Sequence, residues 1–151
     1  MTDKSANGRL EGLDYGLLPE LVGHQLRHGF NRGQLAFREV FRDLDVSPLQ
    51  FMAMELVARN PGIGHATLSA ALGTAPSVMT TTLKPILQSG RLWVARDAAD
   101  GRQVCYHVSE AGHAWYGALR PRISESEARL LARLTPAERE ELLRLLALLA
   151  G

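Results

Sequence analysis

The segment from residue 65 to residue 108 limits the possible folds of this chain more than any other segment. Apolar residues at helical spacing predict a short helix over residues 65–72. Gly73 suits the left-handed turn that would end this helix. A second helix is expected to open at Thr74, whose hydroxyl is a good N-cap. The segment therefore begins with two short helices joined by a tight glycine turn.

The residues after Gly90 change to the pattern of a β-hairpin. Two strand-like runs, residues 92–96 and 103–108, enclose residues 97–102, which are rich in turn-forming types. Two short helices followed by a hairpin predict a winged helix-turn-helix, a mainly α fold with a small β wing. In this fold the second helix has the size to enter the major groove of DNA.

The second helix of this segment has two chemically different faces. Helical spacing directs five apolar side chains toward the core: Val78, Met79, Leu83, Ile86 and Leu87. The outer face is left with the candidate DNA contacts Ser77, Thr80, Thr81 and Lys84. Hydroxyl groups can donate to and accept from base edges or phosphates, and Lys84 supplies positive charge near the DNA backbone.

Pro85 interrupts the pattern of the second helix. A proline inside a helix removes a hydrogen bond and clashes with the carbonyl four residues earlier, at a cost of about 3 kcal/mol. It also disfavours helical angles at Lys84. The sequence therefore predicts a kink or an early end of the helix near Lys84.

The hairpin carries two further candidate DNA contacts, Arg96 and Arg102. An arginine at a wing tip can enter a narrow minor groove, where the negative potential is enhanced. The alternative is a solvated turn in which Asp97 and Asp100 only favour turn geometry.

Charge is distributed unevenly, although the chain as a whole has 17 basic and 16 acidic residues. Residues 56–96 contain no Asp or Glu and four basic residues, whereas the rest of the chain has 13 basic and 16 acidic residues. Such a local positive region is the electrostatic footprint of a protein that binds a polyanion, and chance is the alternative.

The segments that flank residues 47–108 are helical in pattern. Residues 1–16 are polar and predict a loose arm. An amphipathic helix begins near residue 17, with Pro19 in its first turn. Its apolar stripe consists of Leu18, Val22, Leu26, Phe30, Phe37, Val40, Phe41 and Leu44. Ser47 and Gln50 form a capping box that starts the next helix, and Ile63 could add a third strand to the wing sheet.

The C-terminal part is also helical and carries many leucines. Ser109 caps a long helical segment, and Thr135 with Glu138 forms a second capping box. The last helix contains six leucines: Leu142, Leu143, Leu145, Leu146, Leu148 and Leu149. A symmetric partner would cover this surface, the alternative being a helix folded onto its own core. We therefore assign residues 17–46 and 109–151 to dimerisation and residues 47–108 to the DNA-binding lobe, all in one integrated domain.

Four segments together resemble the multiple-antibiotic-resistance regulator (MarR) family of bacterial repressors. Residues 96–102 and 108–112 are similar to the family's Asp-Pro-x-Asp-Arg-Arg wing and the Leu-Thr-x-x-Gly turn after it. Residues 47–51 resemble its Leu-Thr-x-x-Gln-Phe segment, and residues 134–139 its Leu-Thr-x-x-Glu-Arg start of the last helix. The likeness extends from about residue 17 to residue 150.

The resemblance implies a homodimer that represses transcription from a palindromic operator, with half-sites roughly 34 Å apart. It also implies release of the DNA by a small aromatic carboxylate, of the benzoate or cinnamate type, or its CoA thioester. The chain departs from the family at Thr81 and Pro85, where basic residues are usual, and at Gly101, which replaces the second wing arginine. Fewer cations predict a shallower salt dependence of binding.

Candidate effector contacts lie outside the helix-turn-helix as well as within it. His24, Arg27 and His28 occupy neighbouring faces of the first helix and could bind a carboxylate. The aromatic residues that could stack on a ligand ring are Phe51, Trp93 and Trp115. The alternatives are solvated side chains or pairs across a dimer, and a metal site is disfavoured because no cysteine or carboxylate joins the trio.

The sequence supports other classes of function less well. Cys105 could sense oxidants, but a thiol in a wing strand is more often a small packing residue. A ligand-independent DNA-binding protein is a second alternative. An enzyme is remote, because the sequence has no nucleophile elbow, phosphate loop or metal-binding histidine pair, and no cofactor is expected. A single cysteine and the absence of an apolar leader favour a cytoplasmic protein.

Overall fold

The structure, a computed structural model of the chain, describes residues 10, 12–96 and 104–151. The predictions for the arm at residues 1–9 and 11, and for Arg102 and the rest of residues 97–103, lie outside this range. The elements in chain order are the 3₁₀ turn η1 (Leu18–Glu20), α1 (Val22–Val40), α2 (Pro48–Arg59), β1 (Ile63–Gly64), α3 (His65–Ala71), α4 (Pro76–Gln88), β2 (Leu92–Arg96), β3 (Val104–Val108), α5 (Glu110–Leu130) and α6 (Pro136–Ala150).

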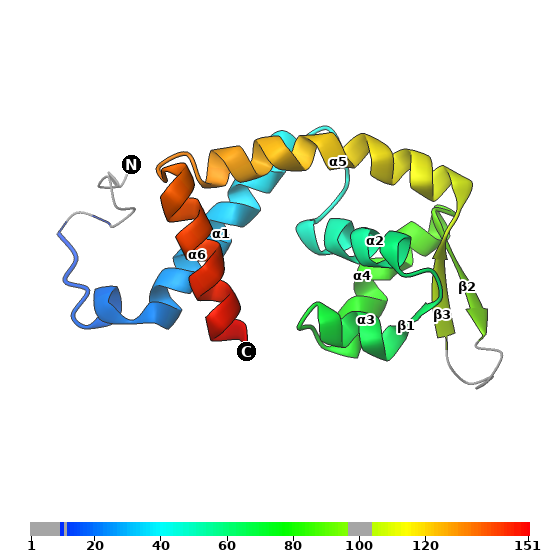
Figure 1. The fold of residues 1–151 in the computed structure, drawn as a ribbon, viewed down its shortest axis with the longest axis horizontal. Helices are drawn as coiled ribbons and strands as arrows, with labels where there is room; N and C mark the ends of the chain where they lie inside the picture. The colour runs from blue at the N-terminus through cyan, green and yellow to red at the C-terminus, as the bar shows by residue number, and fades with distance from the viewer. Residues whose placement is uncertain (1–9, 11, 97–103) are drawn as a thin grey trace.

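Helix α5 connects two groups of elements (Figure 1). One end of α5 follows β3 and lies against α2 and β3, with α3 and α4 on the far side of α2, and its other half lies against α1 and leads into α6. The helices and the small sheet have the order and packing of a winged helix-turn-helix, so the predicted fold class is confirmed.

Two apolar clusters hold these groups together. The larger cluster joins α2, α3, α4, the sheet and α5 through Ala53, Met54, Val57, Leu68, Met79, Leu83, Ile86, Leu92, Tyr106 and Tyr116. The smaller one joins α1 to α5 through Phe37, Val40, Phe41 and Leu119. Phe51 and Trp115 pack against both clusters, so α1 and the winged helix-turn-helix share a continuous core with α5.

The wing is a three-stranded antiparallel sheet with the order β1-β3-β2. Ile63 pairs with Tyr106, and Cys105 lies between Gly64 and Ala95 on the two neighbouring strands. The predicted third strand at Ile63 is therefore confirmed. Gly62, with φ +84°, donates its N–H to the Tyr106 carbonyl and allows the chain to turn into β1.

Three of the predicted helix starts are confirmed. Ser47 and Thr135 each accept a bond from the backbone N–H three residues later, and Gln50 and Glu138 complete the two capping boxes. Ser109 accepts from the Gly112 N–H at the start of α5.

The first helix begins later than the sequence predicts. Leu18 to Glu20 form a 3₁₀ turn, and Leu21 is extended (φ −83°, ψ 116°), so α1 starts at Val22. The Gln25 amide donates to the Pro19 carbonyl and satisfies the end of this turn. Within the described chain only the C-terminal half of α1 is buried, and Val22, Leu26 and Phe30 are exposed.

Three predictions for α4 are wrong. Thr74 is not the N-cap, because Pro76 occupies the first helical position and so makes the extended Ala75 the cap. Val78 is 47% exposed and does not reach the core. The early end predicted near Lys84 does not occur: the helix continues through Pro85 to Gln88, with Leu83 and Ile86 buried on one face on both sides of the exposed proline.

Candidate nucleic-acid interface

The turn between α3 and α4 fixes the orientation of the second helix. Gly73 has φ +57°, a conformation that costs glycine little, as predicted. Leu68 of α3 and Met79 of α4 are both fully buried and belong to the same cluster. Ser69, also buried, donates its hydroxyl to the His65 carbonyl, and its own carbonyl accepts from the Thr74 N–H. The outer face of α4 is thus held away from the core.

All four predicted contacts on α4, namely Ser77, Thr80, Thr81 and Lys84, are exposed. Three threonine hydroxyls of this helix donate to the carbonyl four residues earlier, at 2.9–3.1 Å: Thr80, Thr81 and Thr82. Thr80 and Thr81 are exposed, so their methyl groups remain for an outside partner, as do the hydroxyl lone pairs of Thr81; the Thr80 hydroxyl oxygen also lies 3.4 Å from His65 Nε2.

A histidine that the sequence analysis missed ties the wing to α4. His65 Nε2 lies 3.0 Å from the Pro76 carbonyl, which can only accept, so Nε2 carries the proton. Nδ1 then accepts from the Tyr106 hydroxyl at 2.8 Å. Tyr106 belongs to β3, and burial raises the pKa of its phenol. The only sequence signal for this link is a histidine at the start of a helix.

The two predicted wing contacts are placed differently. Arg96 is exposed at the end of β2 and takes part in an interaction within the chain, while Arg102 lies outside the described residues. Other cations of the positive segment are engaged. Arg91 stacks on the Trp115 ring at 4.5 Å, and Arg59 pairs with Glu55 at 3.3 Å. Lys84 is the one charged residue of α4.

The six predicted effector contacts lie in three places. His24, Arg27 and His28 are on α1, with the two histidine rings edge to face at 4.5 Å. Phe51 stacks on Tyr116 at 5.9 Å, and Trp115 packs beside it against both clusters. Trp93 is on the wing, stacked on His107 at 4.3 Å.

A groove of about 620 Å³ runs between α1, α5 and α6 and reaches the start of α2. Its lining is mostly apolar and includes Leu26, Phe30, Met52, Leu130 and Leu146. No Lys, Arg or His belongs to this lining among the described residues. The helical spacing of His24 and His28 places them on the side of α1 away from Leu26. The groove can therefore hold an apolar ring, whereas a carboxylate would need a cation from elsewhere.

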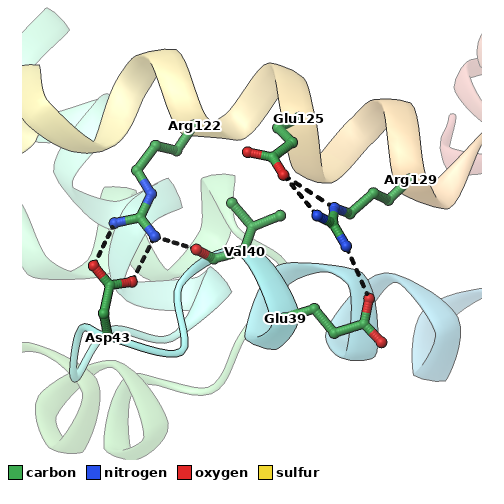
Figure 2. A network of polar contacts seen from close by, with 6 residues as sticks. All are labelled: Glu39, Val40, Asp43, Arg122, Glu125 and Arg129. Carbon is green, nitrogen blue, oxygen red and sulfur yellow. Dashed lines mark hydrogen bonds and ion pairs between the residues drawn. The ribbon is translucent and has the colours of Figure 1, made fainter.

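A polar network joins the end of α1 to α5 (Figure 2). The Arg122 guanidinium donates to both Asp43 oxygens and to the Val40 carbonyl, and it lies over the Phe41 ring at 4.8 Å. The same ion pair holds the pKa of the Asp43 carboxyl below its ordinary value of 3.8. Arg129 pairs with Glu125 at 2.8 Å and with Glu39 at 3.5 Å. The Arg122–Asp43 pair fastens the loop between α1 and α2 to α5, and the Arg129–Glu39 pair joins α1 itself to α5.

Cys105 is buried, 8% exposed, in the central strand of the sheet. No group of His, Cys, Asp and Glu suited to a metal ion occurs among residues 10, 12–96 and 104–151. Within the same residues, none of the helices combines the length and the hydropathy that crossing a membrane requires.

No family model matches the sequence. A protein of Thauera aromatica, described as a transcriptional regulatory protein for the hcr operon, is 27% identical over 148 residues, which are 95% of this chain and 87% of that protein. The repressor CouR, solved bound to a 23-mer DNA duplex, is 25% identical with a TM-score of 0.84, covering 93% of this chain and 100% of CouR. Bordetella bronchiseptica BpsR, whose DNA binding is regulated by 6-hydroxynicotinic acid, has a TM-score of 0.84 at 22% identity, covering 92% and 99% of the two chains.

The glycine turn, the exposed face of α4 and the wing sheet, together with these likenesses, define a winged helix-turn-helix protein of the kind that regulates transcription. Within that class the fold resembles that of MarR, which has a TM-score of 0.76 with this chain at 17% identity, covering 93% of each chain. The relatives and structural neighbours are regulators and not enzymes.

Proposed function

We propose that the protein is a ligand-responsive repressor that binds a palindromic operator as a homodimer. A small aromatic carboxylate or its CoA thioester would release it from the DNA. The single observation that carries the proposal is the exposed outer face of α4, held by the Gly73 turn and by His65 in the position of a recognition helix. CouR, which has this fold, is solved on a DNA duplex and supports the same use of α4 here.

Homodimer formation is supported by the apolar surface of the terminal helices. No residue of α6 is buried in the single chain, and Leu143, Leu148 and Leu149 are each more than half exposed. Val22 and Phe30 of α1 are also more than 60% exposed. Exposed apolar surface of this extent on adjacent helices is typical of an interface. A two-fold partner would place two α4 helices on successive half-sites of one operator.

The groove between α1, α5 and α6 is the cavity best suited to an aromatic effector. An apolar lining fits a ring, and BpsR provides a precedent for regulation of DNA binding by an aromatic acid. The acid group would need a cation from outside the lining. His24 and His28 lie on the far side of α1, so among the three predicted cations of α1 the candidate is Arg27. A ligand that fills this groove would touch both α1 and the start of α2, and could change the position of the DNA-binding lobe.

The decisive experiment measures binding of the purified protein to labelled DNA from around its own gene. We expect retention of a specific fragment by a dimer, and release by at least one of benzoate, cinnamate and their CoA thioesters. Lys84→Ala should weaken binding to all sequences alike and reduce the salt slope by about one for each protomer. A monomer that ignores this DNA at low ionic strength would overturn the proposal, and unchanged affinity across the ligand panel would overturn the effector part alone.

A further inference from the structure

The outer face of α4 is poor in hydrogen-bond donors and rich in methyl groups. We propose that this face reads thymine methyl groups, with Val78 and Thr81 as the specificity-determining residues, so that each operator half-site has A·T pairs under α4. The inference rests on the proposed function and states which bases the recognition helix prefers.

Three residues form an apolar strip along the exposed side of this helix. Val78, Thr81 and Pro85 follow one another at spacings of three and four residues, so their side chains lie on one side of α4. All three are exposed, and Val78 is exposed by 47%. Valine is a weak helix former, and at this exposure it adds little to the core. Its methyl groups are therefore available to a partner.

The hydroxyl of Thr81 does not offer its proton to DNA in this conformation. It donates to the Ser77 carbonyl at 3.1 Å, which leaves the oxygen lone pairs and the methyl group for an outside partner.

The bases differ in what they present to such a surface. Guanine offers two acceptors in the major groove and is usually read by a bidentate arginine or lysine, whereas thymine offers a methyl group and adenine an amino donor. Helix α4 contains no arginine, and its single cation is Lys84. An A·T pair matches both the methyl strip and the acceptor at Thr81. Because Lys84 is assigned to the DNA backbone, a G·C pair leaves its guanine acceptors without a charged donor from α4.

The test begins by selecting the preferred site from random duplexes with the full-length protein. Thymines of the selected half-site are then replaced one at a time by deoxyuridine, which removes only the C5 methyl group and keeps the pairing. Burial of one methyl group corresponds to about fourfold in affinity, so a contacted position changed in both half-sites should weaken binding by about fifteenfold.

Variants assign the effect to residues. Thr81→Ser removes the methyl group and keeps the hydroxyl, so deoxyuridine should no longer weaken binding at the thymine that Thr81 contacts. Thr81→Val keeps methyl groups and should keep the penalty. Val78→Ala should abolish the penalty at a neighbouring position. Thr82→Ser is the matched control, because Thr82 is half-buried on the inner side of α4. Replacing thymine by deoxyuridine should weaken binding of this variant as much as it weakens binding of the wild type.

The outcomes separate this inference from the function on which it rests. If the wild-type protein retains no DNA, both the thymine preference and the proposed function are overturned. Selection of G·C pairs under α4, or equal affinity for thymine and deoxyuridine at every position, would overturn the thymine preference and leave a DNA-binding regulator. A penalty that persists in both Thr81→Ser and Val78→Ala would overturn the assignment to these residues.

Discussion

His65 connects three elements that must keep their relative positions if α4 and the wing are to contact one duplex together. Its ring accepts from Tyr106 on β3 and donates to Pro76 at the start of α4, while its backbone begins α3. Both ring nitrogens are engaged, so the ring is held at two points. A side chain held in this way fixes the relative positions of α3, the start of α4 and β3.

Removal of the Tyr106 hydroxyl tests this link. Tyr106→Phe keeps the buried ring but leaves His65 Nδ1 without its donor, so we expect a loss of about 1 kcal/mol in the free energy of unfolding, measured with urea. Operator affinity should fall as well, because the start of α4 is less firmly placed. Tyr15→Phe is the control, since the Tyr15 hydroxyl meets the Leu10 N–H far from α4. Equal affinity for wild type and Tyr106→Phe would exclude a positioning role.

Asp43 gives the loop between α1 and α2 a dependence on pH. Its pairing with Arg122 lowers the carboxyl pKa in the folded state below 3.8, so the pair stabilises the fold above that pH and the benefit is lost as the pH falls through the lowered value. Asp43→Asn should therefore melt at a lower temperature than wild type at neutral pH. The difference should shrink as the pH falls below 3.8 and close once the pH is below the lowered pKa of Asp43.

Asp45→Asn provides the comparison for this measurement. Asp45 lies two residues further along the same loop, and it forms no ion pair with any of the described residues. Its substitution should leave the melting temperature near that of wild type at each pH. A gap between Asp43→Asn and wild type that persists in acid would show that the ion pair is not its cause.

At the scale of whole elements, the first turn of α5 shows why a glycine follows the wing. A Cβ at Gly112 would collide with the Arg91 carbonyl and lie 2.8 Å from Val108 Cγ1. The close approach lets Ser109, which caps α5, also donate to the Gly90 carbonyl at 2.7 Å. Helix α5 is thereby fastened to the base of the hairpin.

Two alanine substitutions in α5 should have opposite effects on stability. Gly112→Ala should destabilise the protein by at least about 1–3 kcal/mol, because the backbone at Arg91 must move. Gly117→Ala in the same helix has nothing within 4 Å of the new Cβ and should stabilise it by about 0.5–1 kcal/mol. Denaturant melts of both variants measure the difference, and a neutral Gly112→Ala would contradict the packing described here.

Much of the element pattern could be predicted because its signals are local. Capping boxes at Ser47 and Thr135, the Gly73 turn and the third strand at Ile63 each depend on a few neighbouring residues. The error at Pro85 arose because burial of flanking residues outweighs a local helix-breaking preference.

The candidate site was less predictable than the fold. Exposure of Ser77, Thr80, Thr81 and Lys84 follows from helical periodicity, which the sequence displays directly. The link through His65 joins residues 41 positions apart, and such pairing leaves no periodic signal. The candidate ligand-binding residues were predicted from the chemistry of their side chains. The groove between α1, α5 and α6 depends on how these helices pack, which side-chain chemistry alone does not specify.

At the scale of the whole molecule, α6 is stable only if something covers it. A 15-residue helix without a buried residue gains little from packing, and isolated helices of this length are marginal in water. Leu142 and Leu146 line the groove with α1, while Leu148 and Leu149 are more than 60% exposed. A second chain that covers these leucines would stabilise α6, complete the surface around the groove and set the spacing of the two α4 helices.

Leu148→Glu tests whether dimerisation depends on this surface. Leu148 is 69% exposed in the single chain, so the change costs little in a monomer, but it would place a charge in an apolar interface. We expect a shift from dimer to monomer mass by light scattering, and a loss of operator affinity of at least tenfold, since two linked half-site contacts become separate binding events. Val94→Glu is the matched control for the mass measurement, because Val94 is an exposed apolar residue of β2 in the other lobe. A Leu148→Glu protein that stays dimeric and binds the operator normally would remove the terminal leucines from the interface, and with them the spacing argument for a palindromic site.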